Sequence, residues 1–147
     1  MKICIVSSCG GHLTEVRQVR PAYAPYDHFY VLNKRITVPE DMAEKTVYFI
    51  RHSERDLLFF TNLLEAWRIL RSERPDVILS TGAGPAVPFA IVGRLLGVKV
   101  LFIETLARIH APSLTGRLMY RLSNRFFYQF ETLARFFPRG ECGGPLL

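Results

Sequence analysis

Two glycine-containing segments carry residue types that could hold an anion. Residues 7–12 read SSCGGH and residues 80–85 read STGAGP. Glycine lets a backbone come close to a ligand, and a helix that begins beyond such a turn presents its positive end to an anion. We therefore predict contacts to a phosphate or another anionic ligand at six residues of these segments: Gly10, Gly11, Ser80, Thr81, Gly82 and Gly84.

Two further side chains could move a proton. His12 directly follows the first pair of glycines, and an imidazole titrates near neutral pH, as a general base requires. Glu104 directly follows the largely apolar run 98–103. A carboxylate at this position could orient a sugar hydroxyl or accept its proton. Two structural alternatives remain open. His12 could cap the helix that follows it, and Glu104 could form an ion pair with Arg108.

A weaker alternative is a dinucleotide-binding module. Residues 82–87 read GAGPAV, and Glu104 lies twenty residues after Gly84, as in a dinucleotide fingerprint. That fingerprint needs Gly or Ala at its sixth position for close packing of helix on strand, and Val87 stands there. The first segment also lacks the Lys-Ser/Thr of a P-loop. We therefore expect no cofactor.

Cysteine and histidine usage predicts neither a disulfide framework nor a metal site. The three cysteines are odd in number, and neither they nor the four histidines show the spacing of metal ligands. A reducing compartment fits this usage. The apolar run at the N-terminus is too short for a signal peptide. Residues 77–93 carry no charge, but glycine and proline interrupt them, so we predict a strand, a turn and a helix rather than a membrane span.

Positive charge is concentrated in the second half of the chain. The formal net charge is +6, and residues 105–139 hold six arginines but one acid. Arg117, Arg121 and Arg125 recur every four residues, and we predict that they contact an anionic membrane surface or a lipid phosphate. A solvated basic face is the alternative. Residues 57–70 are apolar on more than one side and form a second candidate membrane face. No nucleic-acid-binding module is recognisable, so we expect no nucleic-acid partner.

Apolar runs alternate with helical patterns along the chain, which predicts a parallel sheet covered on both faces. We expect strands at residues 2–7, 29–32, 47–50, 77–79, 98–103 and 126–130. We expect helices from residue 12 to the residues before Pro21, and at 56–73, 85–96 and 113–124, followed by an irregular tail at 139–147. Ligands of such sheets gather at the carboxyl ends of the strands, so the two glycine segments and Glu104 should meet there.

Three segments, in order, resemble the acceptor-binding half of inverting glycosyltransferases of the MurG superfamily. They are SSCGGHLTE, STGAGPAVPFAIVGRLLG and VLFIETLARIHAPSLTGRLMYRLSNRFFYQFE. The chain is most similar to the separate-chain form, which comprises the membrane-recruiting subunit of the dolichol-linked chitobiose-forming transferase and the PssD-type subunits of bacterial exopolysaccharide enzymes. The resemblance implies an α/β fold, a Rossmann-like parallel sheet with helices on both faces, equivalent to the N-terminal half of a GT-B glycosyltransferase.

The resemblance also implies a division of labour between two chains. Residues 1–147 would form one acceptor-binding domain whose tail contacts a donor-binding partner, and that partner would hold a UDP-sugar. The acceptor would be a saccharide on a polyisoprenyl diphosphate in exopolysaccharide or capsule synthesis, on the cytoplasmic face of the membrane. His12 or Glu104 would deprotonate the acceptor hydroxyl, without a metal or cofactor. A non-catalytic membrane adaptor that recruits a self-sufficient transferase is the alternative.

Overall fold

The fold is built on one parallel sheet. The structure, a computed structural model, describes residues 1–33, 36–52 and 57–146. Within these residues seven strands pair in the order β3-β2-β1-β4-β5-β6-β7, and every pairing is parallel. The strands are β1 (Lys2–Ser7), β2 (Asp27–Leu32), β3 (Val47–Phe49), β4 (Val77–Gly82), β5 (Lys99–Ile103), β6 (Arg125–Tyr128) and β7 (Glu141–Cys142). The predicted fold class is confirmed.

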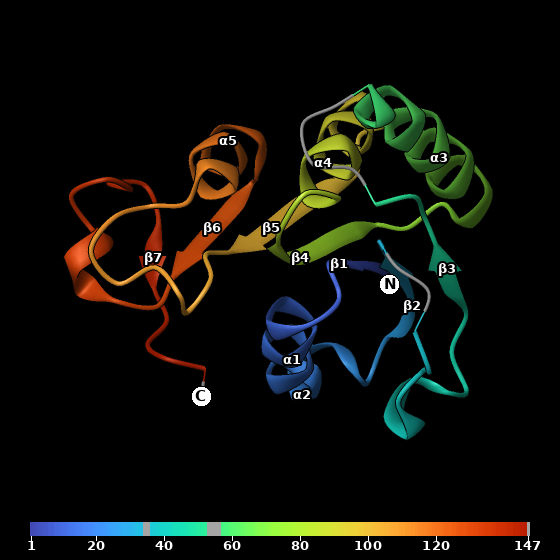
Figure 1. Ribbon diagram of the computed structural model, residues 1–147, viewed down its shortest axis with the longest axis horizontal. Helices are drawn as coiled ribbons and strands as arrows, with labels where there is room; N and C mark the ends of the chain where they lie inside the picture. Colours follow the sequence, from blue (N-terminus) through green and yellow to red (C-terminus); the bar gives the residue numbers. More distant parts are fainter. Residues whose placement is uncertain (34–35, 53–56, 147) are drawn as a thin grey trace.

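Helices lie on both faces of this sheet (Figure 1). One face carries α3 (Leu58–Glu73), α4 (Ala86–Leu95) and α5 (Leu114–Leu122), whereas α1 (Gly11–Gln18) and α2 (Arg20–Tyr23) lie on the other. Two short 3₁₀ helices, η1 (Glu40–Met42) and η2 (Glu131–Leu133), complete the described elements. None of the helices in the described ranges is long and apolar enough to cross a membrane.

The core follows from the alternation of side chains along the strands. Successive side chains of a strand point to opposite faces. Cys4 and Val6 therefore pack in the cluster beneath α3 to α5, whereas Ile3 and Ile5 pack in the cluster on the side of α1 and α2. The residues that form the two clusters are all less than a tenth exposed.

The face that carries α1 and α2 is covered only in part. Beside these two helices lies a hollow of about 520 Å³, lined by apolar side chains of β4, β5 and β6 and by the C-terminal segment. Leu101, Ile103 and Phe127 are half-buried there. Helices therefore lie on both faces, as predicted, but they leave this corner of the sheet less completely covered.

Most predicted elements form, with changes at their ends. The N-terminal helix ends at Gln18, and a second short helix, α2, takes Pro21 into its first turn, where the missing N–H costs nothing. The tail predicted to be irregular contains β7, which pairs with β6. A two-residue strand has no sequence period, so the alternation of side chains could not reveal it. The helix predicted from residue 56 is α3, and residue 56 itself lies outside the described residues.

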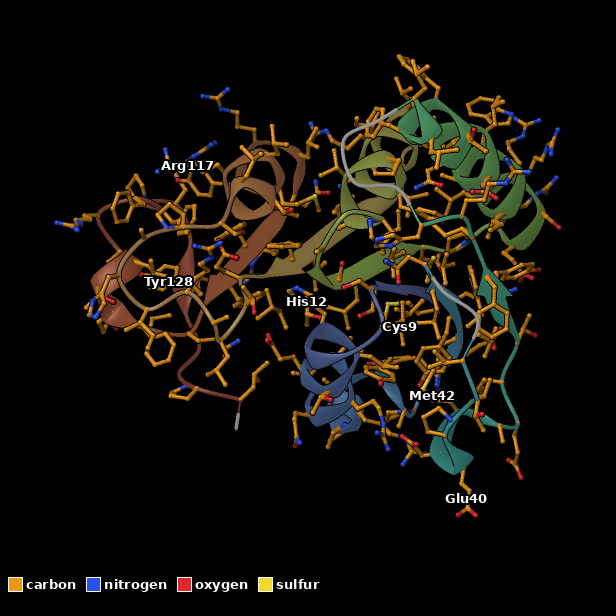
Figure 2. All side chains as sticks on the ribbon, viewed as in Figure 1. Cys9, His12, Glu40, Met42, Arg117 and Tyr128 are labelled. Carbon is orange, nitrogen blue, oxygen red and sulfur yellow. The ribbon has the colours of Figure 1, made fainter. Side chains whose placement is uncertain are left out.

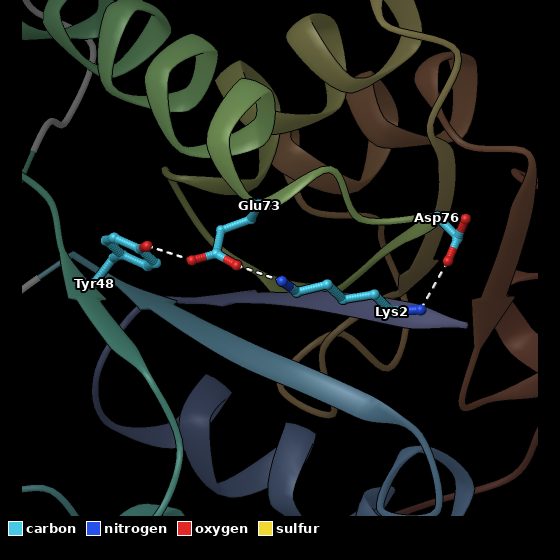
Figure 3. A network of polar contacts seen from close by, with 4 residues as sticks. All are labelled: Lys2, Tyr48, Glu73 and Asp76. Atoms are coloured by element: carbon cyan, nitrogen blue, oxygen red, sulfur yellow. Dashed lines mark hydrogen bonds and ion pairs between the residues drawn. The ribbon is translucent and has the colours of Figure 1, made fainter.

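A polar network ties the ends of several elements together (Figure 3). The Lys2 ammonium donates to Glu73 at the end of α3, and the Tyr48 hydroxyl of β3 donates to the same carboxylate. The Lys2 backbone N–H donates to Asp76 at 2.7 Å. The bond from Lys2, and then that from Tyr48, holds the pKa of Glu73 below its usual value. The bond to Glu73 raises the pKa of Tyr48 to about 12.

Candidate functional site

The two glycine segments meet at the carboxyl edge of the sheet, as predicted. Ser7 at the end of β1 pairs with Gly82 at the end of β4. The Ser8 N–H donates to the Gly82 carbonyl at 3.0 Å, and the Thr81 hydroxyl donates to the His12 carbonyl at 2.8 Å. Neighbouring parallel strands end at one edge, so these bonds join turns that lie about seventy residues apart in the chain.

Gly82 lets the imidazole of His12 approach the backbone closely. A Cβ atom on Gly82 would lie 3.0 Å from Cε1 and 3.1 Å from Nδ1 of His12, and Gly82 has a φ of +117°. Nδ1 of His12 is buried and has no hydrogen-bond partner among the described residues. Helix α1 has no side-chain cap, so the alternative of a capping histidine is wrong. Figure 2 shows His12 at the end of α1 that faces the sheet.

Glu104 is buried and hydrogen-bonded to the loop that follows it. It is 1 % exposed. Oε1 accepts from the Ser113 hydroxyl at 2.8 Å and from the Thr105 N–H at 3.1 Å, and Oε2 accepts from the Ser113 N–H at 3.1 Å. Ser113 in turn caps α5, since its hydroxyl accepts from the Gly116 N–H at 2.7 Å. In the described part of the chain Glu104 makes no ion pair with Arg108, so that alternative is wrong.

Both predicted proton-transfer residues line an inner cavity of about 260 Å³. His12, Thr81, Gly82 and Glu104 line it together with Arg108 and with residues at the start of α5. Ser80 is fully buried and does not line this cavity, and its hydroxyl accepts from the Gly82 N–H. The exposed Gly10 and Gly11 line neither this cavity nor the one beside it. Gly10 has a φ of +100° and forms the turn that leads into α1.

A larger outer cavity of about 720 Å³ adjoins the inner one. The two share Ala83, Leu114 and Thr115, and Gly84 lies in the outer one. Its lining includes polar or small residues, namely Ser8, Cys9, Asn33 and His52. It also includes apolar residues, namely Phe59, Val87, Leu114 and Leu118.

The sequence reasoning missed Asn33 and His52. Asn33 directly follows β2, and its Oδ1 accepts from the Cys9 N–H at 3.0 Å while its Nδ2 lies 2.7 Å from Nδ1 of His52. Because Nδ2 is a donor, Nδ1 of His52 is the acceptor in this pair. The carboxyl-end rule that selected the glycine segments also selects the residue after β2, so Asn33 could have been found by applying it to every strand.

The three predicted membrane-contacting arginines separate into two groups. Arg117 and Arg121 lie exposed on α5 and, with Arg139, surround a hollow of about 480 Å³ that has Tyr120 in its lining. Figure 2 shows Arg117 on the outer side of α5. Arg125 instead begins β6 and pairs with Glu141 of β7 at 2.6 Å.

Exposed apolar side chains lie on α3 and α5. Phe60, Leu64 and Trp67 of α3 are between 44 % and 64 % exposed, and the exposed fractions of Leu114 and Leu118 of α5 are 51 % and 43 %. The predicted excess of apolar surface on the long helix is therefore present. Within the ranges that the structure describes, no group of three or more His, Cys, Asp or Glu residues could hold a metal ion.

The sheet order and the cavities at its carboxyl edge define a Rossmann-like domain of the kind that forms one half of GT-B proteins. MurG of Acinetobacter baumannii superposes with a TM-score of 0.69 at 16% identity, over 88% of this chain and 41% of that one. UDP-N-acetylglucosamine 2-epimerase of Rickettsia bellii superposes with a TM-score of 0.78 at 12% identity, over 99% of this chain and 45% of that one. The chain spans less than half the length of these proteins, and the likeness shows the fold.

The chain belongs to the Alg14-like family. The model of this family, described as "Oligosaccharide biosynthesis protein Alg14 like", matches residues 53–146. A human relative, the UDP-N-acetylglucosamine transferase subunit ALG14, is 25% identical over 100% of this chain and 83% of its own length. The ALG14 subunit of Candida albicans is 41% identical over 50% of this chain and 36% of its own length.

Proposed function

We propose that this chain is the acceptor-binding subunit of an inverting glycosyltransferase whose partner chain holds a UDP-sugar. The observation that carries the proposal is the inner cavity, where His12 and Glu104 face one polar space at the carboxyl edge of the sheet. The family assignment supports the reaction class, because the human relative is named as a subunit of a UDP-N-acetylglucosamine transferase. Because that relative is named as a subunit, the family assignment also supports a second, partner chain.

We assign the general base to His12. Both oxygens of Glu104 already accept hydrogen bonds from Ser113 and Thr105, whereas Nδ1 of His12 has no partner among the described residues. His12 takes the proton of the acceptor hydroxyl as its oxygen attacks the anomeric carbon of the donor. The new bond forms on the face opposite the departing UDP, so the configuration inverts. Glu104 holds the loop before α5 against the cavity.

We assign the outer cavity to the lipid-linked part of the acceptor. A polyisoprenyl diphosphate has a polar head and an apolar tail, and the lining of the outer cavity contains both polar and apolar side chains. We place the diphosphate near Gly84, at the N-terminal end of α4, where the positive end of the helix favours an anion. The first isoprene units lie between Phe59 of α3 and Leu118 of α5. Gly10 and Gly11 then shape the first turn and do not contact the acceptor directly.

Attachment to an anionic membrane surface is part of the same proposal. The exposed apolar residues of α3 and the cations Arg117 and Arg121 are the two candidate contacts. A cation near an anionic surface contributes about 1 kcal/mol, so R117A/R121A should weaken binding to phosphatidylglycerol vesicles roughly thirtyfold. R125A is the matched control, since Arg125 pairs with Glu141. Equal binding by all three proteins would exclude α5 and leave α3 as the contact.

Turnover by the reconstituted pair of chains tests the catalytic assignment. Loss of a general base costs about 10² to 10⁴ in rate, so H12A should lower kcat by that factor while its melting temperature stays close to that of the parent. E104A should lose both turnover and stability, because Ser113 and Thr105 lose their acceptor. Unchanged turnover of H12A would contradict the role of His12.

A membrane adaptor remains the second candidate, because exposed apolar side chains lie on α3 and α5. An adaptor is dispensable once its partner reaches the membrane by other means. A partner fused to a membrane anchor should therefore still need this chain with His12 intact if the chain is catalytic. Full activity of the anchored partner alone would establish the adaptor.

We further propose an acceptor of exopolysaccharide or capsule synthesis on the cytoplasmic membrane face, and a partner contact at residues 139–147. The apolar hollow beside Gly143, Gly144 and Leu146 supports the partner contact. Assays on membranes with a panel of UDP-sugars and lipid-linked acceptors test the first proposal. Ile103→Arg, which places a charge inside this hollow, should reduce co-purification of the partner, and undiminished co-purification would contradict the second proposal.

A further inference from the structure

Glu15 is a buried carboxylate that the proposed reaction does not use. It lies one turn after His12 on α1 and is 5 % exposed. No Lys, Arg or His of the described residues pairs with it. An ionised carboxylate is costly to bury unless several donors satisfy it. The groups that donate hydrogen bonds to Glu15 therefore identify the segments of the chain that this carboxylate fixes to α1.

These donors come from the loop between β5 and α5 and from the end of β6. The Thr105 hydroxyl donates to Oε1 at 2.7 Å, and the Leu106 N–H lies 3.3 Å from both oxygens. The side-chain amide of Gln129 donates to Oε2 at 3.2 Å and to the Glu104 carbonyl at 3.0 Å. Glu15 thus joins α1 to the first residues after Glu104, while Ser113 holds the Glu104 side chain at the other end of the loop.

This arrangement couples the two residues that face the inner cavity. Residues i and i+3 lie on the same side of a helix, so His12 and Glu15 move with α1 as one unit. The loop that Glu15 holds begins at Glu104. We propose that Glu15 is a positioning residue that sets the separation of His12 from Glu104 across the inner cavity by fixing Thr105 and Leu106 to α1. This inference rests on the proposed function.

The first test compares a conservative substitution of Glu15 with a double variant that exchanges the carboxylate and the amide of Glu15 and Gln129. Glu15→Gln keeps the shape but turns one acceptor into a donor, which then faces the Gln129 amide or the Leu106 N–H. Displacement of reacting groups by about 1 Å costs on the order of a hundredfold, so kcat of the reconstituted pair should fall about ten- to a hundredfold. KM for the UDP-sugar should stay unchanged, because the partner holds it. In E15Q/Q129E a carboxylate at position 129 accepts from the new amide at position 15, but it no longer donates to the Glu104 carbonyl, so only part of the lost kcat should return.

Amide hydrogen exchange gives a readout that does not depend on activity. E15Q should raise the exchange rates of Leu106 and of the loop to Ser113 at least tenfold, and E15Q/Q129E should reverse this increase in part. Thr105→Val, which removes one hydroxyl at nearly constant shape, should give a smaller effect in the same direction. Gln18→Ala, on the exposed side of the same helix, should match the parent in both measurements.

The outcomes separate this inference from the proposed function. If H12A lowers turnover but E15Q leaves kcat unchanged, Glu15 is not a positioning residue, whatever its effect on the loop. If E15Q lowers kcat but leaves the exchange of Leu106 and of the loop to Ser113 unchanged, positioning through Thr105 and Leu106 is wrong. If H12A itself leaves turnover unchanged, the proposed function fails, and exchange in E15Q still reports whether Glu15 fixes the loop.

Discussion

Gly116 is the position where one added methyl group should do most damage to the candidate site. A Cβ atom there would lie 1.8 Å from Oε2 of Glu104 and 2.6 Å from its Cδ. Contacts of a real Cβ atom essentially never fall below 3.0 Å, so the carboxylate must move by about 1.2 Å, the difference between 3.0 and 1.8 Å. It must move away from Ser113, which lies on the same helix turn.

The cost of Gly116→Ala follows from the bonds that this movement breaks. The two bonds from Ser113, at 2.8 and 3.1 Å, lengthen beyond hydrogen-bonding distance. Bonds to a charged acceptor contribute about 1.5–3 kcal/mol each, and alanine in a helix gains up to about 1 kcal/mol over glycine. With partial relaxation, the net loss is about 3 kcal/mol. Each kcal/mol shifts Tm by about 2–4 °C in a domain of this size, so Tm should fall by roughly 6–12 °C.

A double-mutant cycle with thermal unfolding checks this reasoning. In the E104A background the new methyl group meets no carboxylate, so Gly116→Ala should be neutral or stabilising by up to about 1 kcal/mol. Gly143→Ala is the matched control, because a Cβ atom on Gly143 meets nothing within 4 Å. The same loss from Gly116→Ala with and without Glu104 would refute the reasoning, as would a Tm within 2 °C of the parent.

Two further substitutions test other contacts. Gly82→Ala should cost about 1–3 kcal/mol and lower turnover of the reconstituted pair, because its positive φ strains alanine and its methyl group displaces the ring of His12; kinetics equal to the parent would contradict this contact. Glu73→Gln should cost about 1–3 kcal/mol at pH 7, measured by urea unfolding. Because the pKa of Glu73 is lower in the folded state, its stabilisation is complete above about pH 5 and is lost as the pH falls through that lowered pKa. The gap between parent and Glu73→Gln should therefore close in acid, and a constant gap would show that the bonds from Lys2 and Tyr48 do not depend on the charge.

The sequence predicts which residues meet at the carboxyl edge of the sheet, because their positions follow from where the strands end. Alternation of apolar runs and helices indicates a parallel sheet, and the carboxyl ends of parallel strands share an edge. This reasoning alone brings His12, Gly82 and Glu104 to one cavity, as the structure confirms.

Contacts inside the loops are beyond the reach of such patterns. The partner of Glu104 is Ser113, nine residues later, because the loop folds back onto the carboxylate. The buried position of Glu15 follows from the packing of α1 against that loop, and no local period marks it. The helical spacing of four residues also continues from Arg121 to Arg125 although the helix ends at Leu122, so the pattern alone groups an arginine of β6 with two of α5.

The central position of β1 has a consequence for folding during synthesis. β1 and β2 are complete once residue 32 has been added, but the other edge of β1 stays unpaired until β4 is complete at residue 82. At 5–20 residues per second this interval lasts roughly 3 to 10 s. During it, the nascent chain presents an apolar strand with a free edge, which is a substrate for chaperones and a site of aggregation. The strand that ends this exposure also brings Gly82 to His12, so this contact and the protected edge of β1 form in the same event.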